Sequence, residues 1–490
     1  MAFYSVVRLT ILWHWLCIFA SSAVASITAA TDLANLRTQL SPNASISWST
    51  SDAPRWSDYD APQPIAIINV AAEKDVQITI QFCNSKSIPY LVQNGAHGSS
   101  TTLGQLNHNG VIINLAALNR VTFNSEKTLV SLGGGTLMSE MIQSAYSNSA
   151  LVLSGTCNCI GYLGALLGGG TGYLMGQYGL MLDNVVSLNV VLASGQAITI
   201  TPSADAEYDE SLWWALRGAG PNFGAVTSAV VKSYPVNSTA LNAWLGPLVF
   251  EESQLGTLIQ TMNDITLQPR MAMSLTFASS GNASVSPLII LTVFYHGTEA
   301  QGKAAFAPIY EIGPVADNTS IISYPDWNAA QDTSCIKGGN KPSFGAGLAG
   351  LEPKSWEVVY DAYKEFLLHP EAQDSVILLD AYSTAQISSI SDSSTAYPFR
   401  STIRFNAQAS LVWNGSSFDA SALAFGSFCR DKWRLSSGLK KNSTYINNAF
   451  GDESLTTVYG QSLQRLQDLK NIYDPYGRFN YWFPLDGDKK

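Results

Sequence analysis

A glycine-rich stretch between Ser154 and Asn184 constrains the fold of this chain more than any other part of the sequence. Glycine adopts positive φ angles without a steric penalty and lets the backbone approach a ligand closely. Successive exposed N–H groups can then hold an anion such as a pyrophosphate. A series of tight turns, or a helix packed on glycine faces, would explain the stretch equally well. Its spacing matches neither a P-loop nor a strand-led G-x-G-x-x-G turn. The glycines are Gly155, Gly161, Gly164, Gly168, Gly169, Gly170, Gly172, Gly176 and Gly179.

Three further clusters of small residues precede or follow this stretch. Residues 93–98 read Gln-Asn-Gly-Ala-His-Gly and follow a predicted strand, so His97 is accessible to a ligand lying along the loop. By itself, this histidine is better explained as a surface loop residue. Residues 133–135 are three glycines after another predicted strand, and residues 212–220 read Leu-Trp-Trp-Ala-Leu-Arg-Gly-Ala-Gly.

The length and charge of the chain limit its class. At 490 residues it exceeds the roughly 250–300 residues that one hydrophobic core can serve, so two domains are expected. Apolar residues make up 46% of the chain and charged residues 13%, as in a globular enzyme. A net charge of −10 argues against nucleic acid as a partner, because phosphate binding needs a basic patch.

The N-terminus resembles a secretion signal. Residues 9–20 are largely apolar, and Ala23-Val24-Ala25 forms a small-residue cleavage site. The apolar run is shorter than the roughly 20 residues of a membrane span. We therefore expect residues 1–25 to be a signal peptide, no membrane span after its removal, and a protein that is secreted or resides in a vesicular lumen. N-glycosylation is expected at six Asn-x-Ser/Thr sequons, namely Asn43, Asn237, Asn282, Asn318, Asn414 and Asn442.

The cysteine count points to one special thiol. Removing Cys17 with the signal peptide leaves an odd number, namely Cys83, Cys157, Cys159, Cys335 and Cys429. In an oxidising compartment an odd number suggests that one thiol has another task. If the segment is extended, Cys157 and Cys159 point the same way. No cluster of histidines accompanies them, so a metal site is not expected.

The hydrophobic pattern predicts an α+β fold. From residue 64 to 235, short β-rich runs alternate with helical ones. Predicted strands cover residues 65–70, 89–93, 111–114 and 128–132, predicted helices cover 73–86 and 137–148, and 185–200 forms a hairpin. Beyond residue 235 the pattern predicts a large antiparallel sheet with helices on one face. Its strands cover residues 272–277, 288–296, 375–381 and 404–413, and its helices cover 297–312 and 420–436.

Taken in order, the four clusters resemble the vanillyl-alcohol oxidase superfamily, and specifically its berberine-bridge-enzyme-like branch. An Asp-Asn pair at 183–184 and an Asp-Pro-x-x-x-Phe-Asn tail at 474–480 complete the pattern. The resemblance covers most of residues 60–485 and is nearest to fungal enzymes of secondary metabolism. It implies a two-domain FAD-binding fold of the PCMH type. The FAD-binding domain is expected at residues 26–235, the substrate domain at 236–449, and a return to the FAD-binding domain at 450–490.

The resemblance also assigns the cofactor contacts. In that branch the loop histidine bonds to the flavin 8α-methyl group and the cysteine bonds to C6, which implies bicovalent FAD on His97 and Cys157. That leaves four thiols, enough for two disulfides. The other cofactor-binding residues implied are Asn94, Gly95, Ala96, Gly98, Gly155, Thr156, Gly161, Gly164, Gly168, Gly169, Gly172, Val226 and Asn480.

On the substrate side the resemblance places Gln408 over the flavin, where an amide can orient a substrate hydroxyl. Two tyrosines that many relatives carry are Thr171 and Asn448 here, and neither is a general base. Tyr445 is then a candidate base. Ile160, near the ring edge, does not distinguish an oxidase from a dehydrogenase.

The sequence therefore predicts a monomeric FAD-linked oxidase that acts on a small-molecule substrate. A secondary-metabolite phenol, enol or allylic alcohol needs little help from a base and fits the missing tyrosines. Dioxygen would reoxidise the flavin and give hydrogen peroxide, and cyclisation of the product could follow. Two alternatives remain open at this point: a carbohydrate oxidase of the same fold, and a flavin-holding protein that catalyses non-redox cyclisation or only binds a ligand.

Overall fold

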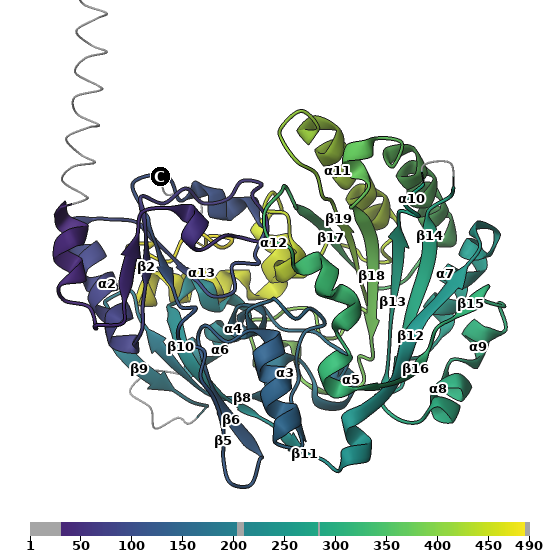
Figure 1. Cartoon of the computed structure of the whole chain (residues 1–490), viewed down its shortest axis with the longest axis horizontal. Helices are drawn as coiled ribbons and strands as arrows, with labels where there is room; N and C mark the ends of the chain where they lie inside the picture. The colour runs from purple at the N-terminus through teal and green to yellow at the C-terminus, as the bar shows by residue number, and fades with distance from the viewer. Residues whose placement is uncertain (1–30, 203–209, 283–284, 486–490) are drawn as a thin grey trace, which may run out of the picture.

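The computed structural model of the protein describes residues 31–202, 210–282 and 285–485. The predicted signal peptide lies outside them. The described chain forms two parts side by side, one built from the N-terminal half and the C-terminal tail and the other from the residues between (Figure 1). This is the α+β architecture that the sequence predicts, with short mixed sheets in the first part and one large antiparallel sheet in the second.

The first part contains a four-stranded sheet in the order β1-β2-β4-β3. Strands β2, β3 and β4 run parallel and β1 antiparallel. Helix α2 packs on this sheet and buries Val76, Ile80 and Cys83 in the same core as Ile68 and Val111. The elements are β1 (Ser45–Ser47), β2 (Ala66–Asn69), α2 (Glu73–Lys86), β3 (Tyr90–Gln93) and β4 (Val111–Asn114).

A five-stranded antiparallel sheet follows, in the order β5-β6-β10-β8-β9. The predicted hairpin is its β8–β9 pair. Helices α3, α4, α5 and α6 share a large core with it. The elements are β5 (Val121–Phe123), β6 (Leu129–Gly133), α3 (Met138–Ser147), β7 (Ala150–Leu151), α4 (Tyr162–Leu167), α5 (Met175–Tyr178), β8 (Val185–Val191), β9 (Ala197–Ile200), α6 (Glu210–Ala219), β10 (Ala225–Lys232) and β11 (Tyr234–Pro235), where β7 pairs with β11.

The second part is an eight-stranded antiparallel sheet in the order β15-β12-β14-β13-β18-β19-β17, with β16 also paired to β12. Helices α7, α10 and α11 cover one face (Figure 1). The elements are β12 (Asn242–Phe250), α7 (Leu255–Asp264), β13 (Met271–Ala278), β14 (Leu288–Tyr295), α8 (Glu299–Ala305), α9 (Ala307–Tyr310), β15 (Ala316–Asp317), β16 (Ser320–Ser323), β17 (Ser343–Leu348), α10 (Pro353–Phe366), β18 (Val376–Tyr382), β19 (Phe405–Ser410) and α11 (Asp419–Leu435).

Alternation along these strands gives the sheet two different faces. Side chains of successive strand residues point to opposite faces. On β18, Ile377 and Leu379 enter the core under the helices, whereas Leu378 and Asp380 point to the opposite side. The same alternation on β13 and β19 leaves a face free of helices, and that face looks toward the first part of the molecule.

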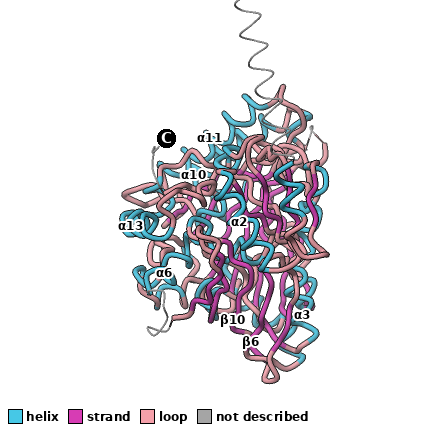
Figure 2. Tube along the Cα trace, turned by 90° about the vertical axis from the view of Figure 1, so that its left-hand side faces the viewer, coloured by secondary structure: helices cyan, strands magenta, loops and turns pink. Residues whose placement is uncertain are grey.

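The C-terminal segment packs against the first part. Helices α12 (Leu455–Tyr459) and α13 (Leu463–Tyr473) precede it, and α13 lies beside α6 (Figure 2). The buried ammonium of Lys470 donates to the carboxylate of Asp474 at 2.7 Å and to the carbonyls of Asn222 and Phe479. This buried pair joins the end of α13 to the loop before β10 and to the tail.

Two expectations from the sequence need correction. The single helix predicted at residues 297–312 is two helices, α8 and α9, because Phe306 leaves helical geometry and Pro308 begins a new first turn. The sequence allowed two disulfides, but the described residues form one, Cys159–Cys335. Cys83 and Cys429 are buried in different cores and cannot meet. Across the part of the chain that the structure describes, no helix is long and apolar enough to cross a membrane.

Candidate active site

A cavity of about 440 Å³ lies between the first part and the helix-free face of the large sheet. Three loops of the first part line one side, and side chains of β13, β14, β18 and β19 line the other. The tail residues Asn480, Tyr481 and Trp482 close one end. A cavity of this size and mixed polarity between two parts of an enzyme is a typical ligand site.

His97 lies on the loop after β3, with its ring stacked on Trp56 at 4.3 Å between centroids. Burial lowers its pKa to about 3, and the positive charges of Lys341 and Arg55 act in the same direction. The imidazole is therefore neutral and has a free electron pair near neutral pH. Its buried Nε2 has no hydrogen-bond partner within the described chain. A buried, neutral and unpartnered imidazole is suited to bonding with a ligand.

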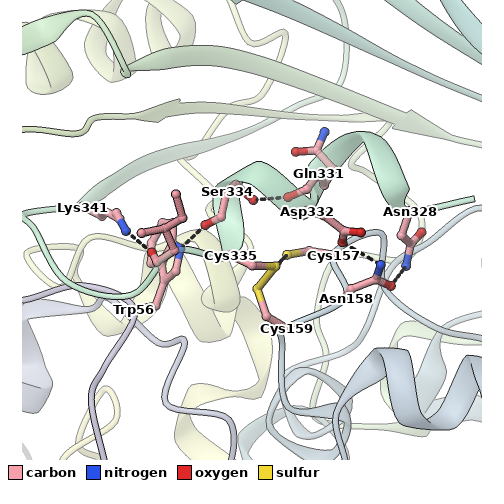
Figure 3. Close-up of a disulfide and its surroundings, with 11 residues drawn as sticks. Trp56, Cys157, Asn158, Cys159, Asn328, Gln331, Asp332, Ser334, Cys335 and Lys341 are labelled. Carbon is pink, nitrogen blue, oxygen red and sulfur yellow. Dashed lines mark hydrogen bonds between the residues drawn. A yellow bond between two sulfur atoms is a disulfide. The ribbon is translucent and has the colours of Figure 1, made fainter. Parts of the chain in front are cut away.

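Cys157 lies on the loop that precedes α4, and its Sγ is 3.5 Å from the Sγ of Cys159 (Figure 3). A ring nitrogen of His97 and the two sulfurs lie within 4.8 Å of one another. Three such groups could suggest a metal site, but Cys159 is bound to Cys335 and offers no thiolate. Burial raises the pKa of the Cys157 thiol. The histidine and the one free thiol thus meet at a single point of the cavity wall.

Most of the residues assigned to cofactor binding line this cavity. Close contact between two loops fixes part of the wall: a Cβ on Gly161 would lie 1.7 Å from the Oδ1 of Asn94, and a Cβ on Gly95 would lie 2.6 Å from the nitrogen of Gly161. Only glycine fits at both positions. The predicted residues that line the cavity are His97, Cys157, Asn94, Gly95, Ala96, Gly98, Gly155, Thr156, Gly161, Gly164, Val226 and Asn480.

Gly168, Gly169 and Gly172 do not line the cavity, so their assignment as cofactor contacts stays a prediction. Each is required by packing behind the wall. A Cβ on Gly168 would lie 2.1 Å from the Oδ1 of Asn447, and one on Gly172 would lie 1.9 Å from the carbonyl oxygen of Ser154. Gly169 has a φ of +137°. Their neighbours Gly170 and Thr171 reach the cavity instead.

The cavity wall contains buried polar atoms that fit a large polar cofactor such as FAD. The Oδ1 atoms of Asn94 and Asn480 and the hydroxyl of Tyr90 are buried and have no partner in the described chain, like the Nε2 of His97. Buried polar groups in native proteins are almost always hydrogen-bonded. These four atoms belong to the first part and the tail, so a ligand with several polar groups along its length would satisfy them.

Arg55 and Trp56 support the His97 loop and were not singled out in the sequence. The guanidinium of Arg55 donates to the Oε1 of Gln93 and to the carbonyl of Gly98, both at 2.7 Å. It thereby braces the loop at both ends. No sequence motif marks either residue, because their role depends on contact with the His97 loop, which is about 40 residues away in the sequence.

The sheet wall carries one acidic side chain, Asp380, which sequence reasoning missed. It lies on β18, accepts a hydrogen bond from the hydroxyl of Ser274 at 2.8 Å, and is paired across the strands with Asn406 of β19. Burial raises its pKa to about 6, although the Ser274 hydrogen bond opposes this shift. Gln408 lies two residues beyond Asn406 on the same face. A carboxyl group with this pKa can accept a proton near neutral pH.

Tyr445 and Asn448 also line the cavity, but Tyr445 is a poor base. Its hydroxyl oxygen accepts hydrogen bonds from the backbone N–H of Gly170 at 2.8 Å and from the side chain of Asn447 at 2.7 Å. Burial nevertheless raises its pKa to about 12. Tyr445 therefore stays neutral, and its contacts fix the glycine-rich loop against the 446–448 turn.

Comparison with known proteins agrees with this geometry. A family model described as an FAD-binding domain matches residues 64–201. An FAD-linked oxidoreductase of Gibberella zeae, chry5, is 31% identical over 460 residues, which cover 88% of this chain and 89% of that protein. An FAD-linked oxidoreductase of Penicillium rubens, chyH, is 30% identical over 478 residues, which cover 93% of each chain.

Solved structures share the fold. Xylooligosaccharide oxidase from Myceliophthora thermophila, in complex with xylobiose, has a TM-score of 0.76 at 21% identity and covers 89% of this chain and 94% of its own. Glucooligosaccharide oxidase from Acremonium strictum, described with a 6-S-cysteinyl, 8α-N1-histidyl FAD, has a TM-score of 0.80 at 17% identity and covers 93% and 98%.

The fold and the cavity thus define an FAD-dependent oxidoreductase with two parts facing one site. With these similarities over nearly the whole chain, the protein belongs to the FAD-linked oxidoreductases of the vanillyl-alcohol oxidase superfamily.

Proposed function

We propose that this oxidoreductase is a secreted oxidase that holds FAD through bonds to both His97 and Cys157. It oxidises a secondary-metabolite alcohol, phenol or allylic substrate, and dioxygen takes up the electrons as hydrogen peroxide. The observation that carries the proposal is the meeting of a neutral imidazole and a free thiol within 4.8 Å at the wall of the cavity.

The two attachment residues are suited to one ring system. Each offers a nucleophilic atom from a different loop, and the short distance between them lets one end of a planar ring reach both. Trp56 holds the imidazole plane by stacking, and the Cys159–Cys335 disulfide fixes the loop of the thiol. Preorganised nucleophiles of this kind lose little conformational freedom when they react.

Bound FAD would supply a two-electron acceptor that takes a hydride from the substrate and passes two electrons to dioxygen. The protein residues then have two tasks on the sheet side. Asp380 takes the proton of the substrate hydroxyl, because its carboxylate has a pKa close to neutral and lies in the cavity wall. Gln408 and Asn406 orient that hydroxyl with their amide groups.

The lining favours a substrate that is partly flat and apolar. Trp327, Tyr173 and Leu378 provide aromatic and aliphatic surface in the same cavity as Asp380. A ring stacked on these side chains, with one hydroxyl toward Asp380, would satisfy both the apolar and the polar parts of the wall. This supports a phenolic or allylic metabolite, whose cyclisation after oxidation the same wall could template.

The sheet wall also favours a second candidate, an oligosaccharide. Its hydroxyl and amide groups include Ser274, Thr276, Thr292, Asn406 and Ser410, and several polar groups in a row suit a polyhydroxylated ligand. Structural neighbours described as oligosaccharide oxidases have the same fold. Anaerobic bleaching of the flavin separates the two candidates: we expect phenolic and allylic alcohols to bleach it, whereas bleaching by xylobiose alone would overturn the metabolite proposal.

Secretion is proposed from the N-terminal pattern and is supported by the surface. All six sequon asparagines are exposed, as glycosylation requires, although the Asn-x-Ser/Thr sequence alone does not place a residue on the surface. A disulfide joining residues 176 positions apart also suits an oxidising compartment. Recovery of the protein from culture medium, with a loss of mass on enzymatic deglycosylation, is the expected result.

The attachment is tested with His97→Ala, Cys157→Ala and the double variant. We expect the wild-type flavin to stay with the protein after acid precipitation, and peptide mass mapping to find flavin on both residues. Each single variant should retain one bond and the double variant none. Acid-stable flavin in the double variant would overturn the proposed attachment, and Tyr445→Phe is the control, since it alters the cavity wall without removing a nucleophile.

A further inference from the structure

Three sulfur atoms meet beside the attachment point, and only two of them are bonded. Cys159 and Cys335 form the disulfide. The free thiol of Cys157 is 3.5 Å from the Sγ of Cys159 and 3.9 Å from the Sγ of Cys335 (Figure 3). A thiolate this close to a disulfide has a second partner within reach of a side-chain rotation, because disulfides exchange by attack of a thiolate on one of the sulfurs.

We propose that Cys157, Cys159 and Cys335 form a thiol–disulfide exchange site that controls whether Cys157 is free to bind flavin. The thiol of Cys157 loses its proton and its sulfur attacks the Sγ of Cys335. The Cys159–Cys335 bond breaks, a Cys157–Cys335 bond forms, and Cys159 leaves as a thiolate that takes up a proton. One disulfide and one thiol are present before and after, so the step needs no oxidant or reductant.

The two segments stay together without the disulfide, so exchange does not require unfolding. Asn158 donates to the carboxylate of Asp332 at 2.7 Å (Figure 3). Asn328 donates to the carbonyl of Gly155 at 3.0 Å. These hydrogen bonds join the loop of Cys157 to the segment that carries Cys335. All three sulfurs therefore remain neighbours while one bond is replaced by another.

The surroundings also allow the chemistry. The thiol of Cys157 is only half-buried, so its proton can pass to water or hydroxide at mildly alkaline pH. The segment Ala329–Cys335 is exposed along most of its length, and none of the three cysteines is fully buried, so water and small thiols can reach the sulfurs. Cys83 and Cys429 cannot take part in the exchange, since their thiols are buried in the cores.

The consequence rests on the proposed attachment of flavin to Cys157. A Cys157–Cys335 bond removes the nucleophile for the C6 position and leaves only His97 available. Once Cys157 carries flavin, the exchange nucleophile is gone and Cys159–Cys335 is the only pairing left. Flavin attachment and the alternative disulfide thus exclude each other.

A matched pair of variants tests this. Cys159→Ser and Cys335→Ser both remove the native disulfide, so a purely structural role predicts the same effect for both. We expect Cys159→Ser, secreted from a yeast host whose oxidative-folding enzymes also make the native bond, to contain a Cys157–Cys335 disulfide and to lose the flavin bond at Cys157. Cys335→Ser should keep that flavin bond, because the cysteine on the neighbouring segment with which Cys157 would form a disulfide is gone. Cys429→Ala is the control outside the cluster and should leave the map unchanged.

The measurement is a non-reducing peptide mass map after alkylation at acid pH. Recovery of both Cys157 and Cys335 as alkylated thiols in Cys159→Ser would overturn the proposal, whatever the state of the flavin. After incubation at pH 8, wild-type molecules without flavin on Cys157 should be a mixture of those with the Cys159–Cys335 disulfide and those with the Cys157–Cys335 disulfide. Finding only Cys159–Cys335 among them would also contradict the exchange proposal. Absence of flavin from Cys157 in all wild-type molecules would instead overturn the bicovalent attachment, while the disulfide map still decides the exchange.

Discussion

Replacing Asp380 by Asn isolates the effect of one buried charge on stability. The folded protein raises the pKa of this carboxyl from 3.8 to about 6, mainly by burial. Between these two pH values the folded state binds more protons than the unfolded state, so its stability falls as pH rises. The difference of about 2 pH units corresponds to roughly 3 kcal/mol of cost for the ionised group above pH 6. The Asp380 side chain is partly exposed to the cavity, and solvent screening brings the expected cost to about 1–2 kcal/mol.

Asp380→Asn should therefore unfold at higher denaturant concentration than the wild type at pH 7.5, and at a similar concentration near pH 4. Asparagine is the suitable replacement, because its carbonyl oxygen can still accept the hydrogen bond from Ser274. Urea unfolding followed by tryptophan fluorescence at both pH values measures the difference. This arm needs no substrate, so it tests the electrostatic argument by itself.

The same substitution should nearly abolish turnover. A positioned general base contributes about 10²–10⁴-fold to rate, and Asn cannot accept the proton. In the wild type, kcat/KM should fall as pH drops through about 6, because Asp380 becomes protonated. Ser274→Ala removes a hydrogen bond that lowers the pKa of Asp380, so the fall in kcat/KM should move to higher pH. Oxygen uptake against pH records both.

An Asp380→Asn enzyme with near wild-type kcat/KM and an unchanged acid limb would refute the assignment of Asp380 as the base. Equal urea midpoints for the two proteins at pH 7.5 would refute the claim that burial of the Asp380 carboxylate lowers the free energy of unfolding. The two results are separable, since a carboxylate can be costly to bury without touching the substrate.

Three other predictions follow from contacts away from this carboxyl. Tyr445→Phe removes the oxygen that accepts the N–H of Gly170, so it should lower stability by about 1–3 kcal/mol and leave the acid limb of kcat/KM in place, as urea unfolding and a pH–rate profile will record. Lys470→Met leaves the buried carboxylate of Asp474 without its ionic partner and should cost about 3–5 kcal/mol, measurable as a large drop in melting temperature. Gly161→Ala places a methyl group where another loop lies, so its yield of folded, flavin-loaded protein, measured by absorbance at 450 nm, should be close to nothing.

The sequence predicted the strands and helices around the site well, because each has a clear period or a clear boundary. Helix α2 was predicted at residues 73–86 and lies at Glu73–Lys86, with charged residues in its first and last turns. Strand β4 was predicted at 111–114 and lies at Val111–Asn114. The helix expected at residues 297–312 failed, because a proline inside an otherwise helical pattern starts a second helix.

The disulfide could not be predicted from spacing. The cysteine count allowed two bonds after flavin attachment, but pairing depends on which core each side chain enters. Cys83 is on the buried face of α2 and Cys429 on the buried face of α11, in separate cores. Helical periodicity predicts that a cysteine faces a core, whereas the disulfide partner of a loop cysteine depends on tertiary contacts.

The loops of His97 and Cys157 and the proposed proton acceptor Asp380 differ in how strongly the fold constrains their sequences. A loop that must pass within contact distance of another backbone needs glycine, as at Gly95 and Gly161, so its positions leave a pattern in the sequence. The helix-free face of the sheet carries no such constraint, because any side chain of suitable size can occupy a strand position that points into a cavity. Asp380 differs from its neighbours on β18 only by being acidic within a mostly apolar strand. Such a residue becomes recognisable as a candidate base only when the structure places Ser274, Asn406 and the cavity around it. The part of this enzyme that binds flavin can therefore be predicted from its sequence, whereas the substrate-binding part can be identified only from the structure.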